Sequence, residues 1–351
     1  MCPRRRVSLL CCKRMLAQSS FPGVVPDNGV RLMPKIDIWS RLTPQSQAAV
    51  EKSRELHAAF KAQSADALTV AREGYNHERA YWNSFKVELP AVLDMAIDTP
   101  AGKLPLRLYR PQAAKALPVL VYVHGGGYIL GNLDTHDRIC RLLAVKSGWA
   151  VLAVDYALAP EKQFPVQPDQ VFAVLQHVAA NGSGMGLDSS RIAIGGDSAG
   201  AHLSLAATLD ARIAGAPSVC AQLLYYGGFG LKDSASMRLY GWADLDGLDE
   251  KDTATYRDHY IANPADRDHP RANLLKSDLA GLPPTFIGAV AYDPLRDDSV
   301  VLAEFMKERC VAHRLVLYEG VLHGFMHYSA MEPKAMHAIE DGAKFLRELP
   351  T

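Results

Sequence analysis

The sequence predicts an α/β fold, with a mostly parallel central sheet, helices on both faces and a small helical cap. From Leu104 onward, short apolar runs alternate with helical patterns, as in parallel sheets covered by helices. The runs are almost continuously apolar, which is typical of strands buried on both faces. The chain has 351 residues, of which 48% are hydrophobic, so it can bury a core large enough for one domain of this class.

The expected elements follow this alternation along the chain. The apolar runs predict strands at 117–123, 150–154, 191–194, 219–225, 285–290 and 314–318. Helical patterns lie between them near 135–147, 168–180, 200–213, 298–310 and 332–348. Two earlier runs, around 91–97 and 106–109, predict an antiparallel edge of the sheet.

Three segments fall outside the alternation. Residues 1–32 are expected to be a disordered extension, with Met15 or Met33 as alternative starts. Residues 33–86 are expected to form an N-terminal helical cap segment, because 44–84 look helical. Residues 87–351 are expected to form the main α/β domain, with a charged, Asp-rich insertion at about 231–263 that folds back over the sheet as a second part of the cap.

Charge and cysteine content exclude several classes of partner. Lys+Arg and Asp+Glu both number 38, and this balance argues against nucleic-acid or acidic-membrane partners, which demand a basic surface. No apolar run reaches transmembrane length, and the N-terminal apolar stretch is too short for a secretory signal. The six cysteines are scattered, which favours a reduced, cytoplasmic protein. The one assembly that we consider is a homodimer.

The most informative motif is Gly196-Asp197-Ser198-Ala199-Gly200, which lies between a short apolar run and a helical pattern. A serine in a sharp strand-to-helix turn leaves little room two positions before and after it, and glycine removes the Cβ clashes there. The hydroxyl would project at the helix start, where backbone amides favour developing negative charge. Ser198 is therefore the predicted nucleophile.

A second glycine-rich loop follows the predicted strand 117–123. The sequence His124-Gly125-Gly126-Gly127 lets the backbone pass close to a substrate carbonyl and direct N–H groups at it. We expect the amides of Gly126, Gly127 and Ala199 to form an oxyanion hole. An ordinary glycine turn is the alternative.

The general base and its orienting acid are expected after later strands, on the loops that leave their carboxyl ends. Asp293 follows the strand at 285–290, and His323 follows the strand at 314–318. Of the nearby alternatives, Asp298 is expected to N-cap the next helix. His327 is expected to be a surface or supporting group. The chain order Ser198, Asp293, His323 is that of α/β-hydrolases.

From about residue 87 to 348 the chain resembles the bacterial hormone-sensitive-lipase-like esterases. The resemblance rests on 124–127, 155–161, 196–200, 293–295 and 323–325. The segments 224–234 and 323–329 are most similar to those of the acetyl-esterase group.

This resemblance implies an α/β-hydrolase fold, no metal or organic cofactor, and short-chain carboxylic esters as small-molecule substrates. It also implies supporting roles, outside the reacting groups, for His124, Gly125, Glu161 and Asp197. Two rival functions stay open. An amidase or peptidase would use the same three residues, and a non-catalytic small-ligand-binding protein could share the fold.

Overall fold

A mixed sheet forms the centre of the computed structural model, which describes residues 36–113, 116–241 and 248–350. Ile36–Thr351 make up one compact unit. The predicted extension 1–32 lies outside the described residues, as do residues 242–247 of the insertion.

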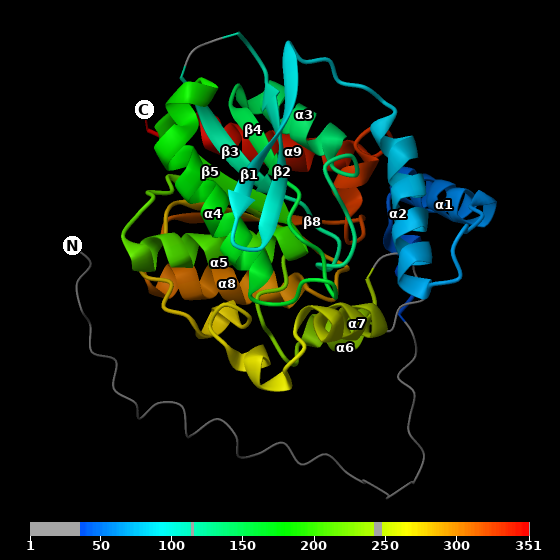
Figure 1. Ribbon diagram of the computed structural model, residues 1–351. Coiled ribbons are helices and arrows are strands. Elements are labelled where there is room, and N and C mark those ends of the chain that lie inside the picture. The colour runs from blue at the N-terminus through cyan, green and yellow to red at the C-terminus, as the bar shows by residue number, and fades with distance from the viewer. Residues whose placement is uncertain (1–35, 114–115, 242–247, 351) are drawn as a thin grey trace, which may run out of the picture. The chain divides into compact units, whose positions relative to one another are not determined.

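Within the described residues, eight strands are arranged in the order β1-β2-β4-β3-β5-β6-β7-β8 (Figure 1). The first two strands pair antiparallel, β2 pairs antiparallel with β4, and the remaining neighbours are parallel. This confirms the predicted parallel sheet with an antiparallel edge. The strands are β1 (Ala91–Thr99), β2 (Gly102–Arg110), β3 (Leu117–Val123), β4 (Ala150–Val154), β5 (Leu187–Asp197), β6 (Ala221–Tyr225), β7 (Thr285–Val290) and β8 (His313–Tyr318).

Helices cover both faces of the sheet, as the alternation of elements predicted. On one face are α3 (Asp137–Ser147) and α9 (Pro333–Arg347); on the other are α4 (Val166–Asn181), α5 (Ala199–Ala214) and α8 (Arg296–Glu308). The side chains of β3 alternate between these layers, with Leu120 and Tyr122 in the first core and Val119 and Val121 in the second. This period of two explains why an almost wholly apolar strand is stable here.

The segments outside the alternation are helical where they are described. The N-terminal pair is α1 (Pro44–Ala59) and α2 (Ala67–Asn83); the insertion contributes α6 (Ala235–Tyr240) and α7 (Glu250–Tyr260). Side chains at the N-caps fix all four starts, because Thr43, Asp66, Ser234 and Asp249 each accept a hydrogen bond from the backbone amide three residues on. Short 3₁₀ turns lie at η1 (Trp39–Arg41), η2 (Gly182–Met185), η3 (Pro264–Asp268), η4 (Leu274–Lys276) and η5 (Phe325–Tyr328).

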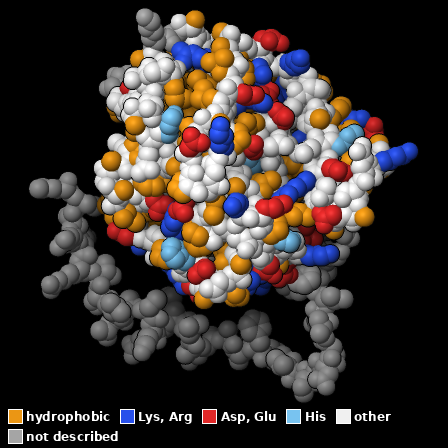
Figure 2. Space-filling view, viewed as in Figure 1, with side chains coloured by type: hydrophobic (Ala, Val, Ile, Leu, Met, Phe, Trp, Pro, Cys, Tyr) orange, Lys and Arg blue, Asp and Glu red, His pale blue; other side chains and the backbone are white. Residues whose placement is uncertain are grey.

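The parallel strands bring several loops to one edge of the sheet. The loops after β3, β5, β7 and β8 carry the predicted site residues, and the carboxyl ends of these strands lie together. On the face shown in Figure 2, acidic and basic side chains are interspersed. None of the described helices is long and apolar enough to span a bilayer.

Candidate active site

Ser198 lies in a sharp turn between β5 and α5, with a backbone φ of +52°. The turn packs against the end of β3, since a Cβ atom on Gly196 would lie 2.2 Å from the carbonyl oxygen of Val123. A Cβ atom on Gly200 would lie 1.9 Å from the same oxygen. No larger residue fits at either position, so the two glycines allow the strained turn that exposes the serine. The Ser198 amide donates to the carbonyl of Tyr225 at 2.8 Å.

His323 joins Ser198 to Asp293. Its Nε2 lies 2.9 Å from the Oγ of Ser198, and its Nδ1 lies 2.7 Å from Oδ2 of Asp293. A carboxylate only accepts, so Nδ1 carries the proton and Nε2 is left to accept from the serine hydroxyl. Asp293 is fully buried, and its other oxygen accepts from the Leu295 amide at 2.8 Å. The acid therefore has a fixed orientation.

The amides of Gly126, Gly127 and Ala199 are available to a ligand. Ala199 is the first residue of α5, where no earlier helical carbonyl exists to accept its N–H. In the described part of the chain, neither Gly126 nor Gly127 donates its amide to a protein acceptor. Both glycines have positive φ, of +118° and +60°. Glycine makes this loop conformation accessible without steric cost.

Asp197 links the glycine loop to the serine turn through hydrogen bonds. Its Oδ1 accepts from the Tyr122 hydroxyl at 2.9 Å and from the Gly125 amide at 3.1 Å, and it lies 3.3 Å from Nε2 of His136. Burial opposes the charged form, but His136 and the hydrogen bonds outweigh it and lower the pKa of Asp197. Asp197 thus stays an anion that anchors both segments. Tyr122 and His136 were not predicted, because neither lies in a recognisable motif.

His124 supports the same loop from another side. Its Nδ1 lies 2.8 Å from the carbonyl oxygen of Gly125, and its ring stacks on that of Tyr156 at 4.3 Å between centroids. The Tyr156 hydroxyl donates to the His124 carbonyl at 3.0 Å. The segment that begins at Asp155 therefore braces the glycine loop directly.

Glu161 lies away from these groups. Its side chain is 59% exposed and pairs with Arg72 at 2.6 Å. Arg72 also donates to the carbonyls of Ile129 and Ala159. Glu161 therefore orients an arginine that joins α2 to the two loops, and it does not contact Ser198 or His323.

One of the nearby alternatives, Asp298, differs from its prediction. Asp298 does not cap α8, because the helix begins at Arg296 and Asp298 lies inside its first turn. The buried Oδ1 of Asp298 accepts instead from the amides of Phe229, Gly230 and Leu231. Three amides that converge on one oxygen outcompete a cap, and a contact this distant in sequence leaves no local signal.

His327 is a buried supporting group and not a surface one. It is 4% exposed, and its ring packs edge-on against His136 at 4.5 Å between centroids. Ligating atoms of His136, Asp197 and His327 lie within 4.8 Å of one another, which is a spacing that a metal ion could bridge. Since Oδ1 of Asp197 already accepts from Tyr122 and Gly125, we describe this cluster as two imidazoles packed around a hydrogen-bonded carboxylate.

Two cavities meet at Ser198. One, of about 600 Å³, is also lined by His323 and by α1 and α2 residues such as Tyr75. The other, of about 530 Å³, is lined by Leu231, Leu295 and much of α7. Tyr256 of α7 lines both, and its ring lies so close to the glycine loop that a Cβ atom on Gly127 would approach it to 2.4 Å. No pattern in the sequence identified this residue.

Comparisons with known proteins agree with this geometry. A family model described as alpha/beta hydrolase fold matches residues 120–327. An acetyl esterase of Salmonella typhi is 38% identical over 317 residues, which cover 89% of this chain and 96% of that protein. A hyperthermophilic esterase from Pyrobaculum calidifontis has a TM-score of 0.82 at 31% identity, over 88% of this chain and 98% of its own.

A second solved structure extends the likeness. The carboxylesterase EstE1, from a metagenomic library, has a TM-score of 0.80 at 30% identity and covers 82% of this chain and 99% of its own. The region that the family model matches includes the end of β3, the strands β4 to β8 and the loops that carry the predicted site residues. The chain therefore belongs to the alpha/beta hydrolase fold family, in its hormone-sensitive-lipase-like branch, and is a carboxylic ester hydrolase.

Proposed function

We propose that the chain hydrolyses short-chain acyl esters through Ser198, His323 and Asp293. Ser198 Oγ attacks the ester carbonyl carbon while Nε2 of His323 takes its proton. The carbonyl electrons move onto the oxygen, and Asp293 stabilises the imidazolium. The intermediate collapses when His323 protonates the departing alkoxide, which leaves an acyl-serine. Water then attacks this acyl group by the same route and releases the carboxylic acid.

The observation that carries the proposal is the unbroken relay of 2.9 Å and 2.7 Å from Ser198 through His323 to Asp293. Hydrogen-bond contact between nucleophile and base, with the base oriented by a third group, is the requirement for an activated serine. Burial of Asp293 strengthens its interaction with the imidazolium, because water screens it less.

In this proposal the oxyanion is bound by the amides of Gly126, Gly127 and Ala199. One such donor contributes on the order of 10²–10³ in turnover. His124, Gly125 and Asp197 hold the donors in place through the hydrogen bonds described above. Glu161 has a more distant role, as the partner that orients Arg72 against this loop.

The position of His323 suggests which cavity takes which part of the ester. The alcohol oxygen must come within reach of Nε2, so the alcohol portion occupies the cavity that His323 lines. The acyl portion then extends into the cavity lined by Leu231 and Leu295. An acetyl-esterase preference rests on the similarity to the Salmonella acetyl esterases.

Substitution of Ser198 tests the reaction. We expect S198A to lower kcat for p-nitrophenyl acetate by about 10³-fold or more, whereas S183A, at an exposed serine of η2, leaves it unchanged. A fluorophosphonate probe should label the wild type and S183A but not S198A. Full turnover by folded S198A would refute the assignment.

The two rival functions give different results in the same assays. An amidase or peptidase would hydrolyse a matched anilide at a rate comparable to the ester. A non-catalytic binding protein would show neither turnover nor labelling although it is folded.

The proposal also covers the division into domains, the assembly and the location of the protein. We assign residues 33–86 and 231–263 to a cap over a catalytic domain spanning 87–351, supported by the α1, α2 and α7 residues that line the two cavities. A homodimer would use the edge strand β8, where Leu315 and Leu317 are 38% and 46% exposed. The scattered cysteines support a cytoplasmic location.

A further inference from the structure

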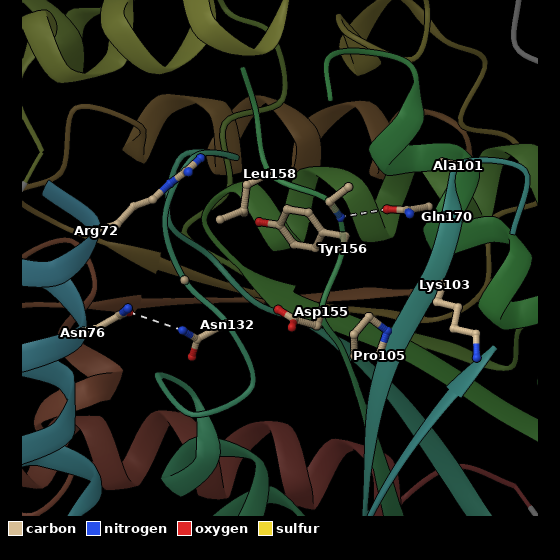
Figure 3. A pocket seen from close by; sticks show the side chains of 12 residues that line it. Arg72, Asn76, Ala101, Lys103, Pro105, Asn132, Asp155, Tyr156, Leu158 and Gln170 are labelled. Carbon is tan, nitrogen blue, oxygen red and sulfur yellow. Dashed lines mark hydrogen bonds between the residues drawn. The ribbon is translucent and has the colours of Figure 1, made fainter. Parts of the chain in front are cut away.

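Beside Gly131 and Asn132, on the loop that continues from the glycines, lies a separate cavity of about 410 Å³ that Ser198 does not line (Figure 3). Its walls come from α2, the β1–β2 hairpin, the loop at Asn132 and the loop after β4. Asp155 lines it, with a side chain that is 30% exposed. No described residue donates a hydrogen bond to the carboxyl of Asp155. This carboxyl lies next to His124, a residue that supports the oxyanion loop.

The protonation state of His124 follows from its contacts. Nδ1 faces the carbonyl oxygen of Gly125 at 2.8 Å, and because a carbonyl only accepts, Nδ1 carries the proton. Burial, and to a lesser extent the neighbouring His136, lower the pKa of His124 to about 3. The ring is therefore neutral, and Nε2 presents a lone pair.

That lone pair is unsatisfied by the described residues. Nε2 of His124 is buried and has no hydrogen-bond partner there, and Oδ1 of Asp155 lies 3.9 Å from it. A buried acceptor without a donor costs about 1–3 kcal/mol. A movement of about 1 Å by Asp155, which has the cavity beside it, would bring its oxygen within hydrogen-bond distance of Nε2.

We propose that Asp155 is a positioning residue for the oxyanion loop. From the 410 Å³ cavity, the protonated carboxyl of Asp155 donates a hydrogen bond to Nε2 of His124. This hydrogen bond holds His124 in the Nδ1–H tautomer that anchors Gly125. In its ionised form Asp155 can only accept, so it faces the lone pair of Nε2 and this anchor is weakened. The inference rests on the proposed function, because Gly126 and Gly127 matter here as oxyanion donors.

The surroundings of Asp155 raise the pKa of its carboxyl above that of a free aspartate. Burial, followed by the charge of Asp134, raises the pKa of Asp155 to about 6, and Arg107 opposes this rise. The titratable and charged groups that face Asp155 or its cavity are Arg72, Lys103, Arg107, His124, Asp134 and Tyr156. Arg72 is already paired with Glu161.

Two substitutions separate positioning from a merely structural role. In D155N the side-chain amide donates to Nε2 at every pH, and in D155L no donor exists at any pH. The exposed Asp98 on β1 offers a matched control, D98N. The measurement is kcat and KM for p-nitrophenyl acetate between pH 5 and pH 9, expressed as the variant's kcat divided by that of the wild type. This quotient cancels every effect of pH that the variants share with the wild type.

We expect the D155N quotient to be near one at pH 5 and to rise about two- to tenfold through pH 6, the effect of one hydrogen bond. The D155L quotient should start about tenfold below one at pH 5 and rise toward one with the same midpoint. KM should change little, because the oxyanion hole acts on the transition state. The D98N quotient should stay at one.

The inference would be overturned if the quotients for D155N and D155L both stayed constant between pH 5 and pH 9, whatever their absolute level. If one variant does not fold, as judged by circular dichroism, the other still gives a pH-dependent or a flat quotient. Failure of the proposed function looks different, because the wild type itself would then lack hydrolysis that depends on Ser198.

Discussion

Replacement of Gly200 by alanine tests whether the serine turn depends on its contact with β3. In G200A the new Cβ atom would lie 1.9 Å from the carbonyl oxygen of Val123 and 2.7 Å from that of His124. Both neighbours are backbone atoms, and a real Cβ atom does not approach closer than 3.0 Å. The turn and the end of β3 must therefore separate by about 1 Å.

This displacement acts on the reacting groups, because Ser198 and the glycine loop lie on the two segments that are pushed apart. A misplacement of about 1 Å lowers rates by about 10²-fold, and we expect that loss in kcat/KM for p-nitrophenyl acetate. Overpacking of this kind also reduces the free energy of unfolding by about 1–3 kcal/mol. Steady-state kinetics and urea denaturation measure the two effects.

G184A is the matched control for G200A. No atom lies within 4 Å of the Cβ position of Gly184, and its φ is not positive. Its kcat/KM and unfolding free energy should equal those of the wild type. A G200A enzyme with kcat/KM within threefold of the wild type and unchanged stability would refute the steric argument.

Three further predictions follow from the site. D293N should lower kcat by about 10³–10⁴-fold, because the amide can donate to Nδ1 and favour the wrong tautomer of His323; stopped-flow and steady-state assays of purified protein check this. Y256A should merge the two cavities at Ser198 and raise kcat/KM for decanoyl relative to acetyl esters about tenfold, whereas Y256F should leave the chain-length series unchanged. Burial raises the pKa of Asp298 to about 6 despite its three amide donors, so the folded state binds more protons than the unfolded state between about pH 4 and pH 6. The unfolding free energy of the wild type relative to D298N should therefore fall by up to about 3 kcal/mol as the pH rises through that window; urea denaturation that shows a constant difference would contradict this.

The sequence predicted the reacting groups of the proposed site because each lies at a strand end. Ser198, Asp293 and His323 follow apolar runs that are easily recognised, and parallel pairing brings such ends together. The sheet was predictable for a related reason. Strands buried on both faces need continuous apolar sequence, whatever their partners are.

The supporting residues escaped prediction because their partners are distant in the chain. Tyr122 points from the interior of β3 to Asp197, and an aromatic residue in a strand is ordinarily a core residue. Asp298 was assigned to a local cap because the three amides that it binds come from a loop almost 70 positions earlier. Tyr256 belongs to a charged insertion, where no periodicity indicates which face covers the substrate.

The contact of Gly196 and Gly200 with the carbonyl of Val123 has a mechanical consequence. Val123 is the last residue of β3, and the loop with the oxyanion amides begins directly after it. The serine turn and the amides of the glycine loop are therefore both held against the end of β3. Thermal displacement of that strand end moves both in the same direction. The distance between them varies less than either position does.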